Sequence, residues 1–162
     1  MQVNKPQSLK GYIVSIIFAM GLNIFSFPAF FKSLSPDWVL LTLIYWMLAM
    51  PERVGVFNAW GVGLMVDALT GRLLGQHALA YALISYFCLM LHKRLRQYLL
   101  LQQSLFVFLS LLLSQIMRLV IENIQSDTQF TIVFWLPVVT GTLFWPILYM
   151  VLRTVSIFGR VR

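Results

Sequence analysis

The sequence predicts an all-α integral membrane protein, with six transmembrane helices in one bundle formed by residues 1–162. Of the 162 residues, 60% are hydrophobic and only 10% are charged, and the mean hydropathy is +0.84. Soluble domains carry about 25% charged residues, which excludes an ordinary soluble enzyme or binding domain. Apolar runs of spanning length recur along the chain, and isolated basic residues separate them.

Six apolar runs are candidate transmembrane spans, since a span needs about 20 residues. They cover about 11–31, 36–50, 54–71, 73–91, 101–121 and 131–152. The first has no small-residue cleavage site before Lys32, so we expect a retained span and not a removed signal peptide. The second lies between Pro36 and Pro51. Its about 13 to 15 residues reach about 20 Å, short of the ~30 Å hydrocarbon core.

The third and fourth spans meet in a tight connection around Gly71 and Arg72, whereas the fifth and sixth are long and apolar. Tryptophans near the span ends support these boundaries, because their amphipathic rings favour the membrane interface. Packing inside the bundle is the alternative, above all for Trp60. The tryptophans are Trp38, Trp46, Trp60, Trp135 and Trp145.

The basic residues predict the orientation. They are dispersed between apolar runs, which excludes a nucleic-acid-binding stripe despite the net charge of +7. With six spans, both termini lie on one side, together with Lys5, Lys10, Arg53, Lys93, Arg94, Arg96, Arg153, Arg160 and Arg162. The other side has Lys32, Arg72 and Arg118. The positive-inside rule then makes both termini cytoplasmic.

A row of small residues interrupted by one acid stands out in the third span and the connection after it. At four-residue spacing it contains Gly55, Ala59, Gly63, Asp67, Gly71 and Gly75. This spacing places side chains on roughly one face of a helix. Small residues there let another helix approach closely. The row predicts a packed intramembrane contact, either within the bundle or with the span of another protein.

Asp67 is a lone acid in an apolar stretch, so it must face protein or water. One hypothesis is an ion or substrate site in a pore. The other is a structural carboxylate, which either pairs with Arg72 or Arg118 or caps a helix start in the Gly71–Gly75 turn. We favour the structural hypothesis, because the span has few other polar residues to form a path. His77 forms either a proton relay or a structural hydrogen bond with Asp67.

Arg118 and Glu122 are four residues apart near the outer end of the fifth span, which predicts an ion pair on one helix face. The pair lies either in the headgroup region or in the bundle interior or a partner-facing position. The five acids are scattered, and no hydrolase, zinc-protease or phosphate-loop motif occurs. A single cysteine, Cys88, gives no disulfide framework. We therefore predict a protein that is not an enzyme and has no catalytic, cofactor-binding or metal-binding residues.

An ordered set of elements within residues 35–95 is similar to the rod shape-determining protein MreD family. A Pro–Asp pair opens an apolar helix, a Pro and a basic residue follow, and a glycine-bearing helix ends in an acid before Gly and Leu–Gly. The residues are Pro36, Asp37, Pro51, Arg53, Gly55, Gly61, Gly63, Asp67, Gly71, Leu74 and Gly75. The span pattern matches along nearly the whole chain.

The resemblance implies a multi-pass protein of the bacterial cytoplasmic (inner) membrane that scaffolds or regulates lateral peptidoglycan synthesis without catalysing it. It implies MreC as the main partner, with MreB, RodA, RodZ and a penicillin-binding transpeptidase in the wider complex. It also implies a fold similar to the six-span substrate-binding subunits of vitamin uptake transporters. A substrate-capturing transporter subunit, with Asp67 and His77 lining a cavity, is the alternative function.

Overall fold

A computed structural model of the protein describes all residues except 1–8, 26–27, 29–30, 32–33, 126–130 and 159–162. In the described part, the regular structure is entirely helical and no strand occurs. This confirms the all-α prediction. The helices are α1 (Leu9–Ile24), α3 (Trp38–Ala49), α4 (Val56–Thr70), α5 (Gln76–Leu95), α6 (Leu100–Gln125) and α7 (Leu136–Phe158), which follows a 3-10 turn, η1 (Ile132–Trp135).

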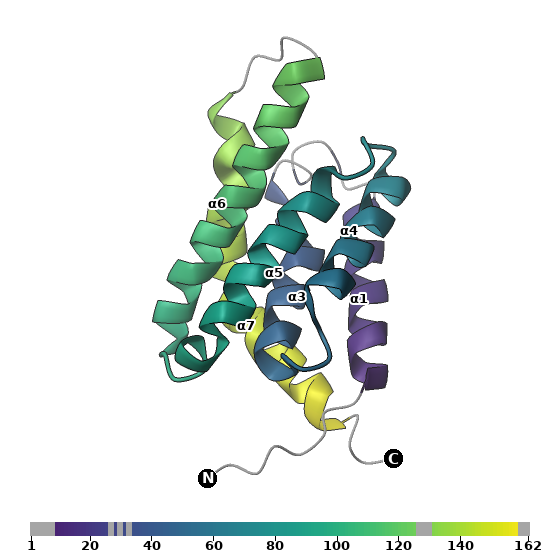
Figure 1. The fold of residues 1–162 in the computed structure, drawn as a ribbon. Helices are drawn as coiled ribbons and strands as arrows, with labels where there is room; N and C mark the ends of the chain where they lie inside the picture. Colours follow the sequence, from purple (N-terminus) through teal and green to yellow (C-terminus); the bar gives the residue numbers. More distant parts are fainter. Residues whose placement is uncertain (1–8, 26–27, 29–30, 32–33, 126–130, 159–162) are drawn as a thin grey trace.

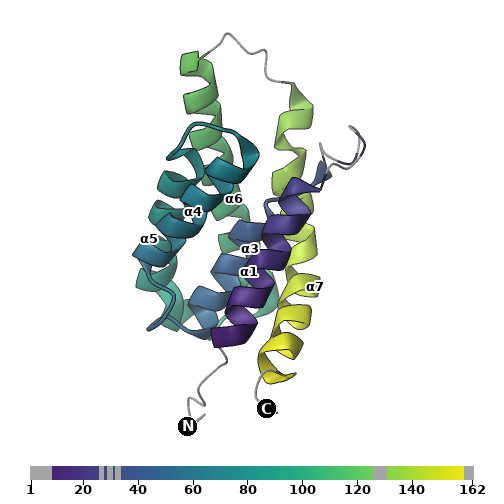
Figure 2. The same ribbon diagram turned by 90° about the vertical axis from the view of Figure 1, so that its right-hand side faces the viewer.

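The short helix α3 occupies the centre of the bundle. It packs against α1, α5 and α7, while α4 packs mainly against α5, and α6 lies between α5 and α7 (Figures 1 and 2). Ten of the twelve residues of α3 are buried. A helix that is apolar on all sides is expected to be enclosed by others. The short helix α3 is therefore a central helix that the longer helices surround.

Two of the tryptophans near predicted span ends pack inside the bundle. Trp46 and Trp145 are fully buried. The Trp46 indole nitrogen donates a hydrogen bond to the Ser15 hydroxyl at 2.7 Å, and its ring meets Tyr12 edge-on. Trp60, for which internal packing was the stronger alternative, is instead 47% exposed. Burial of a large aromatic ring is a major stabilising contribution, so Trp46 and Trp145 are core residues.

The helix boundaries differ from the predicted spans where glycine or proline interrupts the chain. The first helix ends at Ile24, and Pro28 beyond it cannot continue a helix. The fourth begins at Gln76 and not at residue 73, because Gly71 and Gly75 have positive φ angles and form a turn. Part of the predicted first span, residues 26–27 and 29–30, lies outside the described residues.

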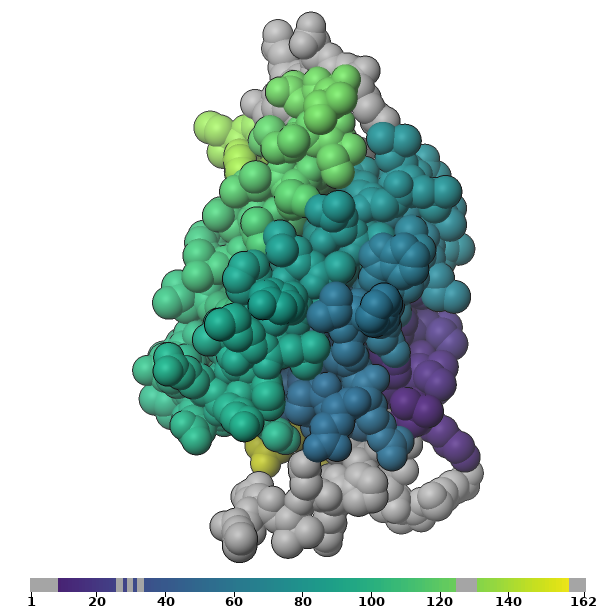
Figure 3. Space-filling model, viewed as in Figure 1, coloured from purple at the N-terminus to yellow at the C-terminus, as the bar shows by residue number. Residues whose placement is uncertain are grey.

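Two stretches are long and apolar enough to cross a membrane, Leu100–Ile124 and Ile132–Ile157, and three apolar helices are shorter. Figure 3 shows α4, α5 and α6 side by side over one face of the molecule. Exposed apolar side chains occur on these helices and on α1 and α7. An apolar exterior of this kind suits contact with lipid or with other apolar helices.

The beginning of α1 and the end of α7 lie at the same end of the bundle (Figures 1 and 2). We call this the basic end, because the described cations there are Lys10, Arg53, Lys93, Arg94, Arg96 and Arg153. The opposite end contains the α4–α5 turn with Arg72 and the last turns of α6 with Arg118. Lys5, Lys32, Arg160 and Arg162 lie outside the described residues.

Candidate functional site: a polar cluster at the α4–α5 turn

A close contact between α4 and α5 brings the polar residues of both helices together. A Cβ added to Gly63 would lie 2.4 Å from the Ala78 Cα, so only glycine fits at this position. Ala59, one turn earlier on the same face, is fully buried. These two members of the small-residue row thus serve packing within the chain, as the internal alternative predicted.

The rest of the row does not continue along this helix face. Gly71 ends α4 in the left-handed conformation with φ 64°, and Gly75 precedes α5 with φ 107°. Gly55 lies at the start of α4, with no atom within 4 Å of an added Cβ. The prediction of one continuous face from Gly55 to Gly75 is therefore wrong. Positive φ angles require glycine in the turn for conformational reasons and not for helix packing.

Asp67 caps the start of α5 across the turn. Its carboxylate accepts hydrogen bonds from the backbone N–H of Gly75 at 2.9 Å, His77 at 3.0 Å and Ala78 at 3.3 Å. The side chain is fully buried. First-turn N–H groups have no partner within their own helix, and a carboxylate there also interacts favourably with the helix dipole. The capping alternative is confirmed, whereas pairing of Asp67 with Arg72 or Arg118 is not observed.

His77 connects Asp67 to α6. Its Nδ1 lies 2.7 Å from Asp67 Oδ1, and its Nε2 lies 3.2 Å from a terminal nitrogen of Arg118. Arginine can only donate, so Nε2 accepts and the proton lies on Nδ1, which donates to Asp67. The structural hydrogen bond predicted between His77 and Asp67 is therefore present.

Asp37 is the second buried acid of the cluster. Its carboxylate accepts a hydrogen bond from the Leu40 backbone N–H at 3.2 Å, which caps α3. The Tyr81 hydroxyl lies 2.8 Å from both carboxylate oxygens, and the Asn23 amide donates at 3.3 Å. An Asp directly before an apolar run is an N-cap signal that the sequence contains. Tyr81 and Asn23 carry no comparable signal, and sequence reasoning missed them.

The predicted ion pair between Arg118 and Glu122 is wrong. Glu122 pairs with Arg72 at 2.7 Å, while Arg118 lies 3.9 Å from Asp37 Oδ2. The Arg118 side chain is only 20% exposed. A partly buried guanidinium needs partners, and inside the bundle His77 accepts its hydrogen bond while the Asp37 carboxylate supplies a negative charge at 3.9 Å. Arg72, from the turn, then reaches Glu122.

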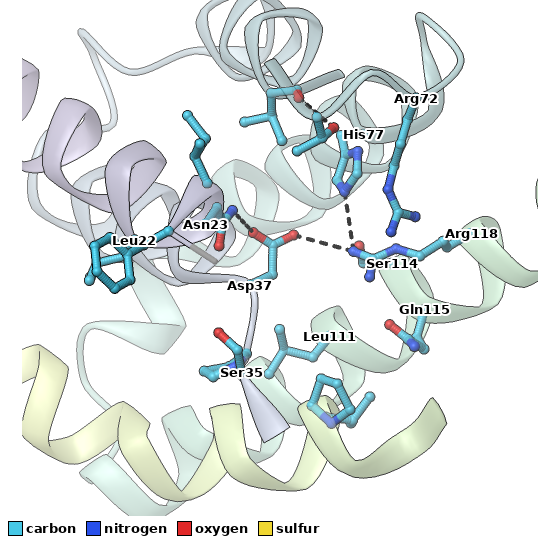
Figure 4. A pocket seen from close by; sticks show the side chains of 17 residues that line it. Leu22, Asn23, Ser35, Asp37, Arg72, His77, Leu111, Ser114, Gln115 and Arg118 are labelled. Atoms are coloured by element: carbon cyan, nitrogen blue, oxygen red, sulfur yellow. Dashed lines mark hydrogen bonds and ion pairs between the residues drawn. The ribbon is translucent and has the colours of Figure 1, made fainter. Parts of the chain in front are cut away.

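A cavity of about 180 Å³ opens beside this cluster, lined by residues of α1, α4, α5, α6 and α7 and by the segment just before α3. Figure 4 shows Asp37, His77 and Arg118 around it, with Arg72 extending toward Arg118 from the turn. Partial burial, and to a smaller degree the charge of Arg118, lower the pKa of Arg72 from its usual value. Within the described ranges, no group of three or more His, Cys, Asp or Glu residues could hold a metal ion.

Comparison with known proteins identifies the family. The sequence profile of the rod shape-determining protein MreD family matches residues 7–155. The chain belongs to the MreD family. The Haemophilus influenzae rod shape-determining protein MreD is 30% identical over 142 residues, which cover 86% of each chain. No solved structure matched significantly.

MreD family membership confirms the sequence-based recognition and assigns the chain a role in rod shape determination. The family is membrane-associated, and the apolar helices of this chain agree with that. It is a family of shape-determining structural proteins. The comparisons do not support the alternative function, a substrate-capturing subunit of an uptake transporter.

In this MreD-family chain, the polar cluster, formed by Asp37, Asp67, His77 and Arg118, joins four helices. Asp37 begins α3, Asp67 reaches from α4 to α5, and Arg118 on α6 contacts both His77 and Asp37. Each of the two acids accepts hydrogen bonds from several donors, so the geometry suits a structural role in which the cluster holds α3, α4, α5 and α6 together.

Proposed function

We propose that this chain is a non-enzymatic scaffold and regulator of the machinery that builds the lateral peptidoglycan of rod-shaped bacteria. In this proposal, residues 1–162 form one multi-pass domain in the cytoplasmic membrane, and the domain acts by binding other membrane proteins. Membership of the MreD family supports the role in cell shape. The engagement of Asp37, Asp67 and His77 in structural hydrogen bonds supports the non-enzymatic part.

The proposed orientation has both termini in the cytoplasm. The basic end has six described cations, whereas the opposite end has Arg72 and Arg118. Cytoplasmic loops are enriched in Lys and Arg, so the basic end faces inward. A topology reporter fused after Arg162 tests this, because an external signal would contradict an even number of spans.

The partner surface that we propose is the outer face of α4. The exposure of this face is the main structural observation behind the proposal. Phe57 is 89% exposed, Trp60 47% and Met65 61%. Gly61 lies among them, with no atom within 4 Å of an added Cβ. A glycine open to the outside of a peripheral helix lets another transmembrane helix approach closely. Ala59 and Gly63, on the opposite face, are already covered by α5 and the bundle interior.

MreC is the partner that we propose for this face, with MreB, RodA, RodZ and a penicillin-binding transpeptidase in the wider complex. The support is membership of a family that belongs to the rod-shape machinery. The resemblance that implies these partners includes Gly61, one of the glycines of its glycine-bearing helix.

Substitution Gly61→Leu tests the proposal. A Cβ added at this position has no atom of the chain within 4 Å, so we expect the fold to persist while the close approach of a partner helix is blocked. We expect at least about a tenfold loss of MreC co-purification, since a blocked interface core costs more than about 1.4 kcal/mol. Cells in which this chain is the sole copy should lose rod shape.

Gly21→Leu is the matched control, because Gly21 is also an exposed helical glycine without atoms within 4 Å of an added Cβ. Both variants should accumulate to wild-type levels, as measured by fluorescence-detected size exclusion. Normal MreC recovery and normal rods with Gly61→Leu would exclude the α4 face as the partner surface. Equal defects in both variants would show that bulk on any outer face is harmful.

A further inference from the structure

Two arginines with unused hydrogen-bond donors line the cavity beside the polar cluster. A guanidinium has five N–H donors. Arg118 makes one hydrogen bond, to His77 Nε2, and its distance of 3.9 Å to Asp37 is too long for another. Arg72 makes one hydrogen bond, to Glu122. Among the described residues, neither side chain has a further hydrogen-bond partner, and both line the cavity.

The nearby acids do not use these donors. Asp37 already accepts hydrogen bonds from Tyr81, Asn23 and the Leu40 backbone N–H. Glu122 is not part of the cavity wall and lies at a neighbouring surface pocket with Arg72. The charged side chains of the described wall are Arg72, Arg118 and Asp37, and Arg72 is also paired with Glu122 outside the wall. The unused N–H donors of the two arginines favour an occupant with oxygen acceptors.

The rest of the wall contains both apolar and uncharged polar residues, and the cavity is small. Leu22, Leu111 and Val138 form part of it, and Ile24 and Phe25 at its edge are 48% and 67% exposed. The volume of about 180 Å³ is below the roughly 300 Å³ at which pockets for drug-sized ligands begin. A single head group fits inside, and an attached apolar chain can leave along the exposed apolar edge.

We propose that this cavity binds an oxyanion head group, a phosphate or a carboxylate, carried on an apolar chain. Arg72 and Arg118 donate to the oxyanion from two sides, and the Gln115 and Ser114 side chains lie in the same wall. Charge-assisted hydrogen bonds from guanidinium forks to such oxygens are among the strongest in proteins. The site is separate from the outer face of α4, so it does not depend on the partner proposal.

The test uses the full chain purified in a neutral maltoside detergent and three probes. Dodecyl phosphate carries head and chain, inorganic phosphate carries only the head, and dodecanol carries only the chain. Binding is measured by isothermal titration calorimetry and by the shift in melting temperature. We expect dodecyl phosphate to bind saturably at one site, inorganic phosphate at least about tenfold more weakly, and dodecanol without a saturable site. Sodium dodecanoate replaces dodecyl phosphate to distinguish a phosphate source from a carboxylate source.

Arg72→Gln and Arg118→Lys test the two donors. Each variant should weaken dodecyl phosphate binding about tenfold or more, because it removes charge-assisted hydrogen bonds. Arg118→Lys keeps the charge next to Asp37, and Arg72 lies in the turn, so at least one variant should remain folded. Arg94→Gln, an exposed cation of the basic end, is the control and should bind like the wild type.

Three outcomes would overturn the proposal. The first is wild-type affinity in folded Arg72→Gln. The second is equal saturable binding of dodecanol, which would show that the chain alone is recognised. The third is an equal loss in Arg94→Gln, which would reduce the effect to net charge.

Discussion

The two ends of the bundle use positive charge in opposite ways. At the end with the α4–α5 turn, Arg118 contacts Asp37 and His77, and Arg72 pairs with Glu122. At the basic end, none of the six described cations has an ion-pair partner among the described residues. Cations of the first kind hold helices together. Those of the second kind are free for headgroups and for setting orientation.

The difference follows from where the acids are. Three of the five acids of the chain, Asp37, Asp67 and Glu122, meet the turn end. Each of these three carboxylates is capped or paired, as the burial of Asp67 and the partial burial of Asp37 and Glu122 require. At the basic end, Glu52 is exposed and forms no ion pair within the described ranges. We therefore expect the energetic effects of substitutions to be large at the turn end and small at the basic end.

Among the substitutions considered, Gly63→Leu should lower the free energy of unfolding most. Even a Cβ at this position would lie 2.4 Å from a backbone atom of α5, so the two helices must separate. Overpacking against backbone should cost about 3 kcal/mol or more. It should also displace His77 from the polar cluster. Thermal unfolding in detergent and the yield of monodisperse protein measure the loss.

Gly61→Leu on the same helix is the matched control for this prediction, since a Cβ added at Gly61 has no atom of the chain within 4 Å. Equal stability of Gly63→Leu and Gly61→Leu would show that the α4–α5 contact is not a rigid part of the bundle. The comparison of the two ends would then lose its strongest structural element.

The α4–α5 contact also shows what the sequence can and cannot predict. Four-residue spacing correctly placed Ala59 and Gly63 on one packed face, because helical periodicity is a local property. The same spacing also included Gly71 and Gly75 in the row, although the sequence already predicted a connection around Gly71 and Arg72. The positive φ angles of Gly71 and Gly75 belong to a turn. Two glycines four residues apart form the same sequence pattern in a helix and in such a turn, so the pattern alone does not distinguish the two.

Asp67→Asn should have the next largest effect. The amide can still accept some of the backbone hydrogen bonds, but it loses the negative charge at the start of α5 and the charge-assisted bond from His77. We expect a loss of about 2 kcal/mol in the free energy of unfolding. Chemical unfolding followed by tryptophan fluorescence measures it.

Glu52→Gln at the basic end removes the same charge from an exposed site and should leave the stability unchanged. An Asp67→Asn variant as stable as Glu52→Gln would mean that the cap contributes no net stability. The functional alternative for Asp67 would then have to be examined again.

The polar cluster was predictable only in part, because its partners come from different helices. Local signals identified Asp67 as a helix cap or a structural acid, since capping depends on neighbours in the chain. Asp37 was named only as part of the Pro–Asp pair of the family resemblance. The i, i+4 rule wrongly paired Arg118 with Glu122, because it describes an isolated helix. In the bundle, Asp37 and His77 compete for the same guanidinium. Only the packing of α3, α5 and α6 shows which of the possible partners contact Arg118.

The smallest expected effect concerns the basic end. Replacing Lys93 and Arg94 together by glutamine should change the free energy of unfolding by less than about 0.5 kcal/mol, since both are exposed and have no ion-pair partner in the described structure. The same measurement in detergent removes the anionic headgroups that these cations would meet in a membrane. A loss as large as that of Asp67→Asn would mean that the basic end also stabilises the fold. In that case, the pairing of charges would no longer distinguish the two ends. The positive-inside argument for the orientation would also be weaker, because it assumes that the cations of the basic end are unpaired.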